Sequence, residues 1–241
     1  MKEAWGAVIV AAGRGTRMGT KESKQYLLLR GKPILVHTLE KFEAIEEVTQ
    51  VALVVGEQDV ARCESWIMEY GLSKVKAVVA GGKERQDSVY RGLRALHNEW
   101  VLVHDGVRPL VTAEAVRRCC NAAKQAGAAV LAVPVKDTIK QVNDAGLITA
   151  TPDRRSLWAI QTPQAFRRLQ LLEAHERAQR EQFVGTDDAM AVERIGVEVA
   201  VAEGEYTNIK ITTPEDLPIA ELWLSQHSLQ EQRENERGTK G

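Results

Sequence analysis

The sequence predicts an α/β fold built on a doubly wound, mostly parallel sheet. Two observations carry this prediction: short apolar, β-branched runs recur along the chain, and amphipathic stretches of helical period separate them. Strands that alternate with helices form βαβ units, in which parallel strands are covered by helices. The 241 residues, 44% of them hydrophobic, suffice for one large domain or two small ones, and length alone does not decide between these.

The elements follow one another in a regular order. Buried strands are predicted over residues 5–11, 50–56, 75–82, 100–106 and 128–135. Helices are predicted over residues 33–45, 57–71, 86–97 and 113–126. Pro33 stands in the first turn of the first helix, where a missing N–H is tolerated, and Gly71 ends the second helix.

The alternation breaks from about residue 136 to residue 160. There the segments TIKQV, NDAG and LITAT have the pattern of two strands joined by a turn, which predicts a β-hairpin. An excursion of this size after a strand of the main sheet is either a lid over a site or an arm that pairs with another subunit.

Two further segments combine polar and apolar residues in patterns that predict secondary structure. The stretch GTDDAMAVERIG, residues 185–196, predicts a helix capped by Thr186, with the two following aspartates in its first turn. The stretch YTNIKITTPEDL, residues 206–217, predicts a strand followed by the start of a helix. Lys210 falls in the middle of that strand, where a lysine either snorkels to solvent or meets an anion.

Composition and charge argue against several classes of protein. Lys and Arg number 32 and Asp and Glu number 33, and the resulting charge of −1 argues against a dedicated binder of duplex nucleic acid. We find no apolar stretch near the ~20 residues that cross a bilayer, nor the pattern of a signal peptide. Cys63, Cys119 and Cys120 fit neither a disulfide framework nor a zinc site. We predict a cytoplasmic protein with neither nucleic acid nor membrane as partner.

A glycine-rich loop lies within VIVAAGRGTRMGTKESKQYL, residues 8–27. It lacks the GxxxxGK[ST] pattern of a Walker A loop, and Met18 stands where a dinucleotide GxGxxG pattern needs glycine. Such a turn still lets backbone N–H groups approach an anion, and Arg or Lys side chains add charge. The nearby cations are Arg14, Arg17, Lys21 and Lys24. We favour a phosphate site over a solvated basic loop, with Arg14 and Lys21 as bystanders.

Three predicted strands end in chemically unusual stretches. These are residues 11–19, 80–88 and 104–109. Ligands of doubly wound sheets bind outside the carboxyl ends of the strands, so the three stretches should converge there. In VLVHDGVRP, Asp105 either binds Mg²⁺ or closes a turn through an ion pair with Arg108. The histidines show no metal-ligand spacing, and we assign none of them, including His104, a catalytic role.

Several motifs occur along the chain in a specific order. They are AAGRGTRM, SKQYL, AGGKERQDSV, VHDGVRP, VPVKDTIK, DRRSLWAIQTPQ, GTDDA and NIKITTPEDL. In these motifs, from about residue 5 to 225, the chain resembles the bacterial 2-C-methyl-D-erythritol 4-phosphate cytidylyltransferase family of the non-mevalonate isoprenoid pathway. The resemblance implies a Rossmann-like nucleotidyltransferase domain over residues 1–225, with a β-arm at about 136–160 that interlocks with a second subunit. Residues 226–241, which are polar and charged, are predicted to be a disordered tail.

The resemblance also implies a reaction. Enzymes of the family that the chain resembles transfer CMP from CTP to 2-C-methyl-D-erythritol 4-phosphate with Mg²⁺. The products are 4-diphosphocytidyl-2-C-methyl-D-erythritol and pyrophosphate. The nucleophile is the phosphate of the acceptor, which is largely ionised near pH 7 because its second pKa is ~6. No general base is needed, so catalysis must come from positioning and from stabilisation of charge.

The site residues that the resemblance implies fall into three groups. Catalysis would involve Arg17, Lys24, Arg154 and Lys210. CTP would be bound by Ala11, Ala12, Gly13, Gly15, Gly81, Gly82, Lys83, Ser88 and Asp105. The acceptor would be bound by Arg108, Thr138, Arg154, Thr162, Thr186 and Lys210. Asp105 would hold Mg²⁺, and the arm would carry Thr138 and Arg154 to the site of the neighbouring subunit, which makes a homodimer necessary.

The sequence departs from the family pattern in three places. Val10 replaces a frequent proline, Lys83 replaces a common aspartate, and Gly106 and Val107 replace a usual pair of alanines. Lys83 leaves the selectivity for cytosine open if the family uses that carboxylate. Two other functions stay open: a cytidylyltransferase for another polyol phosphate such as ribitol 5-phosphate, and a non-catalytic nucleotide sensor. Retention of both catalytic cations of the loop argues against the sensor.

Overall fold

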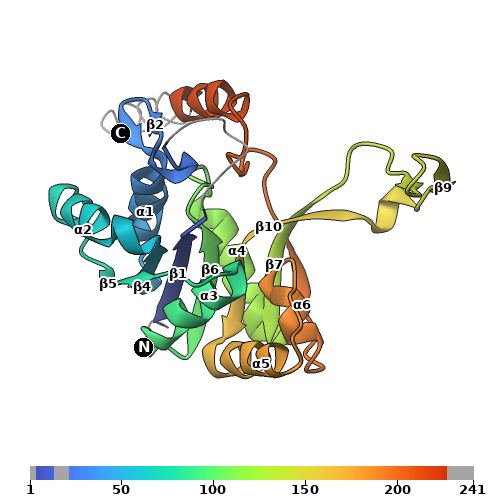
Figure 1. The fold of residues 1–241 in the computed structure, drawn as a ribbon, viewed down its shortest axis with the longest axis horizontal. Helices are drawn as coiled ribbons and strands as arrows, with labels where there is room; N and C mark the ends of the chain where they lie inside the picture. The colour runs from blue at the N-terminus through green and yellow to red at the C-terminus, as the bar shows by residue number, and fades with distance from the viewer. Residues whose placement is uncertain (1–3, 14–21, 227–241) are drawn as a thin grey trace, which may run out of the picture.

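A doubly wound sheet forms the centre of the structure, which is a computed structural model describing residues 4–13 and 22–226. Within these residues seven strands are hydrogen-bonded in the order β11-β7-β10-β6-β1-β4-β5 (Figure 1). They are β1 (Trp5–Ala11), β4 (Val48–Val55), β5 (Val75–Ala80), β6 (Trp100–Asp105), β7 (Ala128–Pro134), β10 (Trp158–Arg167) and β11 (Ala200–Glu203). All five predicted strands are present, and the predicted α/β class is confirmed. The predicted tail lies, from residue 227 onward, outside the described residues.

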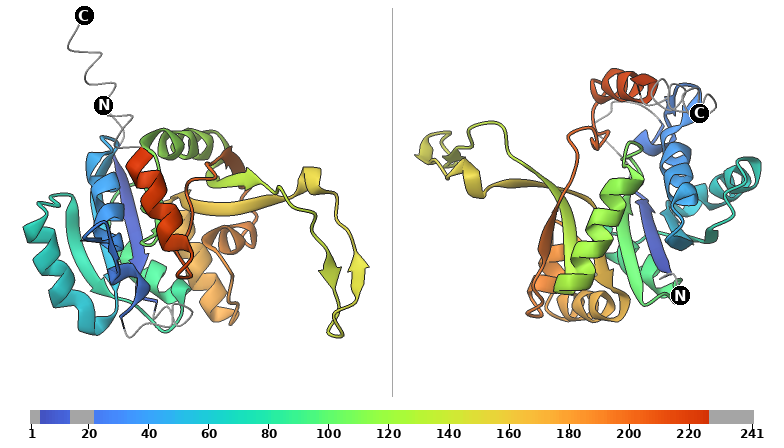
Figure 2. Two further views of the ribbon diagram at one scale, coloured as in Figure 1. Left: turned by 90° about the horizontal axis from the view of Figure 1, so that it is seen from above. Right: turned by 180° about the vertical axis from the view of Figure 1, so that it is seen from behind.

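Helices cover both faces of the sheet, because its central strands are apolar on both sides. Ile9 of β1 belongs to a core cluster with α1, α2 and α4, whereas the adjacent Val8 belongs to a cluster with α3, α5 and α6. The helices are α1 (Ile34–Ala44), α2 (Val60–Glu69), α3 (Arg85–Arg94), α4 (Ala113–Ala126), α5 (Arg168–Arg180) and α6 (Asp188–Glu193). Figure 2 shows these two layers from above and from behind.

Two strands of the sheet differ from the prediction, which assigned no strand to their residues. Strand β10 runs antiparallel to both β6 and β7, so the sheet is mostly and not wholly parallel. Its sequence WAIQTPQAFR mixes Gln, Thr and Pro among the apolar side chains and lacks the continuous apolar run of the central strands. Strand β11 has four residues and pairs in parallel with β7 at the edge of the sheet. Both strands therefore give weak local signals.

Within residues 206–217 the predicted strand is wrong, because the segment before residue 216 is irregular, whereas the predicted start of a helix is confirmed, with a helix beginning at residue 216. The N–H of Ile211 donates a hydrogen bond to the carbonyl of Val107 (3.0 Å), in the loop after β6. Ile209 and Ile211 pack in a third apolar cluster instead of on the sheet. Their alternation with Lys210 therefore reflects packing of a loop, and Lys210 is not in a strand.

That third cluster lies beyond the carboxyl edge of the sheet. It joins Val107 and Ile211 to the short hairpin β2 (Leu28–Leu29)–β3 (Lys32–Pro33), to the start of α1, and to the helix that begins at residue 216 (Figure 1). The segment that carries Lys210 is thereby packed against the loop that follows β6. None of the helices in the described part of the chain is both long enough and apolar enough to span a membrane.

Helix α6 begins later than predicted and has a different cap. The side chain of Asp187 accepts a hydrogen bond from the N–H of Met190 (3.0 Å), which makes Asp187 the N-cap. The hydroxyl of Thr186 instead faces the sulfur of Met190 (3.1 Å). The predicted cap at Thr186 is therefore wrong by one residue, and the Thr186 side chain is not used to start the helix.

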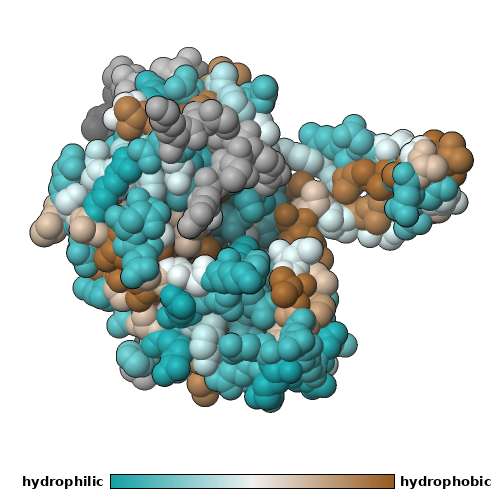
Figure 3. Space-filling model, in the orientation of Figure 1, coloured by the Kyte–Doolittle hydropathy of each residue, from teal (hydrophilic) through white to brown (hydrophobic). Residues whose placement is uncertain are grey.

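The predicted hairpin is confirmed as an extended arm between β7 and β10. Strands β8 (Gln141–Val142) and β9 (Ile148–Ala150) pair antiparallel, and Asn143 closes the turn by accepting the N–H groups of Ala145 and Leu147. Figures 1 and 2 show the arm projecting away from the body of the molecule. Its apolar side chains are open, with Leu147 64% and Ile148 63% exposed (Figure 3). The arm is therefore no lid over the sheet of its own chain.

Candidate active site

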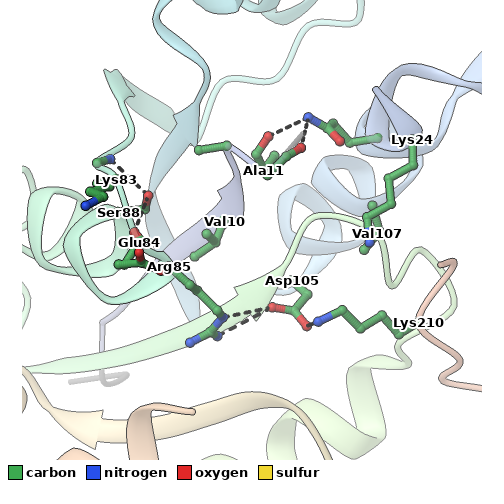
Figure 4. A pocket seen from close by; sticks show the side chains of 14 residues that line it. Val10, Ala11, Lys24, Lys83, Glu84, Arg85, Ser88, Asp105, Val107 and Lys210 are labelled. Atoms are coloured by element: carbon green, nitrogen blue, oxygen red, sulfur yellow. Dashed lines mark hydrogen bonds and ion pairs between the residues drawn. The ribbon is translucent and has the colours of Figure 1, made fainter. Parts of the chain in front are cut away.

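The register of the sheet brings the predicted strand ends together. Val10 of β1 pairs with Asp105 of β6, Ala11 pairs with Val55 of β4, and Val55 pairs with Ala80 of β5. Strands β4 and β5 lie on one side of β1, while β6 lies on the other, so the winding of the sheet reverses at β1. Ligands of doubly wound sheets bind at this switch point. A cavity lies there in the structure (Figure 4).

Most of the residues predicted to bind CTP surround this first cavity. Those that line it are Ala11, Ala12, Gly13, Gly82, Lys83, Ser88 and Asp105, together with the predicted catalytic residues Lys24 and Lys210. Gly15 and the cations Arg14, Arg17 and Lys21 lie outside the described residues. The lining thus combines backbone and small side chains with charged side chains, which suits a nucleotide with a polyphosphate.

Gln25, which the sequence motifs do not single out, connects the glycine-rich turn to the segment that carries Lys24. Its buried side-chain amide donates to the carbonyls of Ala11 (2.8 Å) and Gly13 (3.2 Å). The neighbouring Tyr26 is buried and its ring lies 5.6 Å from that of Trp66 in α2. Lys24 therefore starts from a fixed backbone. In the sequence Gln25 appears only as a glutamine inside the motif SKQYL. That motif has no periodicity that would show that the glutamine is buried.

The opposite wall is formed where β5 passes into α3. The N–H of Gly82 donates to the hydroxyl of Ser88 (3.1 Å), which in turn donates to the carbonyl of Glu84 (3.2 Å). Gly81 does not line the cavity that the described residues form. A Cβ on Gly81 would lie 2.3 Å from the Cβ of Ala12, so glycine allows the two loops to touch.

Replacing Gly81 by alanine is therefore expected to separate these loops and to weaken CTP binding about tenfold, within the 1–3 kcal/mol that overpacking typically costs. Calorimetric titration with CTP measures the effect. The double variant Ala12→Gly/Gly81→Ala removes the methyl group of Ala12, the nearer of two obstructions, and should recover part of the affinity, because the Ser88 hydroxyl at 2.8 Å must still turn away. Ala12→Gly alone serves as the control. Unchanged CTP affinity in Gly81→Ala would show that the close approach is dispensable.

Asp105 is the charged centre of the site. Its Oδ2 lies 2.8 Å from Nζ of Lys210, and its Oδ1 lies 3.4 Å from both Nε and Nη2 of Arg85. The two cations approach from opposite sides, as Figure 4 shows, and Nε of Arg108 lies 3.7 Å from Oδ2. Burial by itself would raise the pKa of Asp105, but Arg85, Lys210 and Arg108 outweigh it and hold that pKa well below its usual value. The carboxylate is therefore charged at neutral pH.

His104 and Thr162 fix the loop that carries Asp105. The carbonyl of Arg108 can only accept a hydrogen bond, so Nε2 of His104 carries the proton and donates to it (3.1 Å). In the neutral ring Nδ1 then accepts from the hydroxyl of Thr162 (3.1 Å), which itself accepts the N–H of Asp105 (3.0 Å). Burial lowers the pKa of His104 to about 4, so the imidazole is neutral near pH 7. His104 orients the end of β6, and both of its ring nitrogens are engaged by groups of the protein.

A second cavity adjoins the first and contains every acceptor-binding residue predicted on the main body. These residues are Arg108, Thr162, Thr186 and Lys210. Arg85, Asp105 and Lys210 line both cavities, so the two sites meet at Asp105. Arg108 is held in place because its Nη1 donates to the carbonyl of Asn208 (2.8 Å). The arrangement can hold two anionic ligands side by side, with cations at their junction.

The arm residues lie apart from both cavities. Within the described part of the chain, neither Thr138 nor Arg154 lines either of them. Arg154 donates from Nη1 to the carbonyl of Lys136 (2.6 Å), which is a contact within the arm itself. In their own chain these two predicted residues therefore lie away from the other predicted acceptor-binding residues.

The fold and the two joined cavities suit a nucleotidyltransferase, an enzyme that holds a nucleotide beside a second anionic substrate at the switch point of a doubly wound sheet. The family model for 2-C-methyl-D-erythritol 4-phosphate cytidylyltransferase matches residues 6–226. The chain belongs to this family. The resemblance seen in the sequence motifs is confirmed.

Relatives and solved structures agree with this assignment. A 2-C-methyl-D-erythritol 4-phosphate cytidylyltransferase from Geobacter metallireducens is 49% identical over 226 residues, which are 91% of this chain and 97% of the relative. One from Geobacillus kaustophilus is 51% identical over 221 residues, 91% and 96% of the two chains. The crystal structure of 4-diphosphocytidyl-2C-methyl-D-erythritol synthase from Anaerococcus prevotii has a TM-score of 0.81 at 32% identity, covering 93% of this chain and all of its own. The Rossmann-like nucleotidyltransferase fold is confirmed.

Proposed function

We propose that this enzyme transfers CMP from CTP to 2-C-methyl-D-erythritol 4-phosphate in the synthesis of isoprenoid precursors, releasing pyrophosphate. One observation carries the proposal: most of the residues predicted for CTP and those predicted for the acceptor on the main body line two cavities that share Asp105, Arg85 and Lys210. A transfer between two ligands requires such a junction, whereas a protein that only senses a nucleotide needs the first cavity alone.

In this proposal CTP occupies the first cavity. The cytosine lies against Gly82 and Ser88, whose mutual hydrogen bond fixes that wall, and the triphosphate lies along the turn from Ala11 to Gly13. Lys24 stands at the same cavity and supplies positive charge to the triphosphate. Arg17 is proposed to act with it.

The acceptor phosphate occupies the second cavity, where Arg108, Thr162, Thr186 and Lys210 surround it. One of its oxygens attacks the α-phosphorus of CTP, a new P–O bond forms, and the bond to the bridging oxygen of the β-phosphate breaks. Pyrophosphate leaves with the electron pair. Both reactants are anions, so the cations at the junction act by reducing repulsion and by stabilising the charge of the transition state.

Mg²⁺ fits the site as a proposed cofactor held by Asp105. The Asp105 carboxylate is buried, charged and common to both cavities, and Mg²⁺ is often held by one or two carboxylates together with substrate phosphates. The described residues contain no group of three or more His, Cys, Asp or Glu side chains suited to a metal, so phosphate oxygens and water would complete the coordination. When bound, the ion would neutralise phosphate charge.

We further propose that the enzyme acts as a homodimer in the cytoplasm. The arm exposes Val142, Leu147 and Ile148 and lies away from its own body, which suits contact with a second copy. Thr138 and Arg154 would then complete the acceptor site of that copy. The buried free thiols of Cys63, Cys119 and Cys120 suit a reducing compartment.

A coupled assay of pyrophosphate release tests the acceptor. The purified protein with CTP and Mg²⁺ is expected to turn over 2-C-methyl-D-erythritol 4-phosphate faster than ribitol 5-phosphate. Faster turnover of ribitol 5-phosphate would assign the enzyme to another polyol phosphate. CTP binding without pyrophosphate release from either acceptor would instead favour a nucleotide sensor.

A further inference from the structure

Arg85 connects the junction of the two cavities to an acid that belongs to neither. Its Nη1 lies 2.7 Å from Oδ2 of Asp188, which is a tight ion pair, whereas its contacts to Oδ1 of Asp105 are longer, at 3.4 Å. The side chain of Asp188 is 1% exposed and that of Arg85 is 30% exposed. The position of the guanidinium is therefore set mainly by Asp188, and its remaining N–H groups face Asp105.

Asp188 is itself held from several sides. Its N–H donates to Oε1 of Gln164 (3.2 Å), and its Oδ1 lies 3.2 Å from Nε2 of His175, which is buried in α5. It also opens α6, whose cap is the neighbouring Asp187. Burial of an ion pair is costly unless the geometry is good, and it is weak support for stability by itself. The buried Arg85–Asp188 pair is explained if its role is to anchor one cation of the active site.

The other two cations near Asp105 also face the acceptor cavity. Lys210 is 39% exposed and has a flexible stem, and in the reaction proposed above it serves the acceptor phosphate. Arg108 lies farther from Asp105, at 3.7 Å, and also faces the acceptor cavity. Arg85 and Arg108 both have an anchor that lines neither cavity, the carboxylate of Asp188 and the carbonyl of Asn208 respectively. Of these two anchors that of Arg85 carries a charge, and Arg85 also lies closer to Asp105 than Arg108 does. Arg85 can therefore stay in place when both ligands bind.

We propose that Arg85, anchored by Asp188, is a positioning residue that keeps the carboxylate of Asp105 in its orientation while Lys210 turns to the acceptor. The inference rests on the proposed function of the site. The planar guanidinium suits this task because its fork of donors contacts two acids at once, which a lysine ammonium at the same place cannot do with the same geometry.

Kinetics of Asp188→Asn test the proposal, because Asp188 lines neither ligand cavity. We expect kcat to fall about 10- to 100-fold, the range for lost outer-shell support, while KM for CTP and for the acceptor changes less than about threefold. The kcat of Arg85→Gln should fall similarly. The kcat of the double variant Arg85→Gln/Asp188→Asn should be no lower than that of Arg85→Gln alone. When Asp105 has already been replaced by Asn, the further change Asp188→Asn should lower kcat less than about threefold.

Glu181→Gln is the matched control, because it removes an acid that pairs with Arg177 of α5 and with Arg194 outside both cavities. Its kcat should match that of the unchanged protein. Multiplicative losses in Arg85→Gln/Asp188→Asn would overturn the proposal, as would a raised KM with unchanged kcat. If Asp188→Asn does not fold, the double variant, which leaves neither charge unpaired, is compared with Arg85→Gln instead. Absence of turnover in the unchanged protein would contradict the proposed function, whereas these variants address only Arg85.

Discussion

Replacing Lys24 by alanine is expected to lower kcat by about a thousandfold, equivalent to about 4 kcal/mol of transition-state stabilisation. The α-phosphorus gains a fifth oxygen neighbour in the transition state and pyrophosphate leaves with additional charge, so a cation at the triphosphate gains interaction as the reaction proceeds. Lys24 lines the first cavity, the one proposed for CTP, from a segment that Gln25 and Tyr26 hold in place. The same loss is predicted for Arg17→Ala, which lies outside the described residues.

Steady-state kinetics with saturating CTP, together with a thermal unfolding curve, check this expectation. The fold should survive, because Lys24 is only half-buried and its neighbours keep their contacts. Lys76→Ala is the matched control: it removes a lysine at the opposite end of β5, where the ammonium group donates to the carbonyl of Ser73. Near-normal kcat in Lys24→Ala would remove this residue from the catalytic assignment.

Replacing Arg154 by alanine is expected to lower kcat/KM for the acceptor by about two orders of magnitude, as loss of a charged contact to a phosphate typically does. CTP binding should change little, because Arg154 lies on the arm and lines neither cavity of its own described chain. The neighbouring Arg155 pairs with Asp153 within the arm (2.7 Å), so Arg155→Ala is a matched control that should keep its activity.

Mixed dimers, formed if the protein is the proposed homodimer, then test in which subunit Arg154 acts. If it acts across the interface, a dimer of one Arg154→Ala chain and one Lys24→Ala chain contains one intact site. Random mixing of equal amounts makes half of the dimers mixed, so about a quarter of the unmodified activity should return. Mixing Lys24→Ala with Lys210→Ala chains, both altered in the cavities of the main body, should restore nothing. If no activity returns in the first mixture, Arg154 acts in the site of its own subunit or has no role in either site.

The sequence predicts the elements whose signals are local. The five apolar strands, the helix at 113–126 and the hairpin around the turn NDAG are all present, since each depends on periodicity or turn chemistry within a few residues. Strand β10 escaped prediction because it carries Gln, Thr and Pro where it passes the site. The segment around Lys210 alternates like a strand because a loop packs its isoleucines into a cluster.

The site was predictable in part for the same reason. Motif residues such as Ser88, Asp105 and Arg108 lie at strand ends, and the parallel register brings strand ends to one edge of the sheet. Arg85 lies within the motif AGGKERQDSV, yet its partner Asp188 is 103 residues away, and no spacing rule joins them. Gln25 likewise becomes meaningful only when the carbonyls of the glycine-rich turn are seen to face it.

The sequence alone thus determined the alternation of strands and helices, the hairpin, the family and the chemistry of two anionic substrates, because these follow from short patterns and their order. The tertiary structure decided which cations share Asp105, which acid anchors Arg85, and that the arm extends away from its own cavities. These relations depend on distances between segments far apart in the chain, and such distances arise only when the sheet and its helices pack.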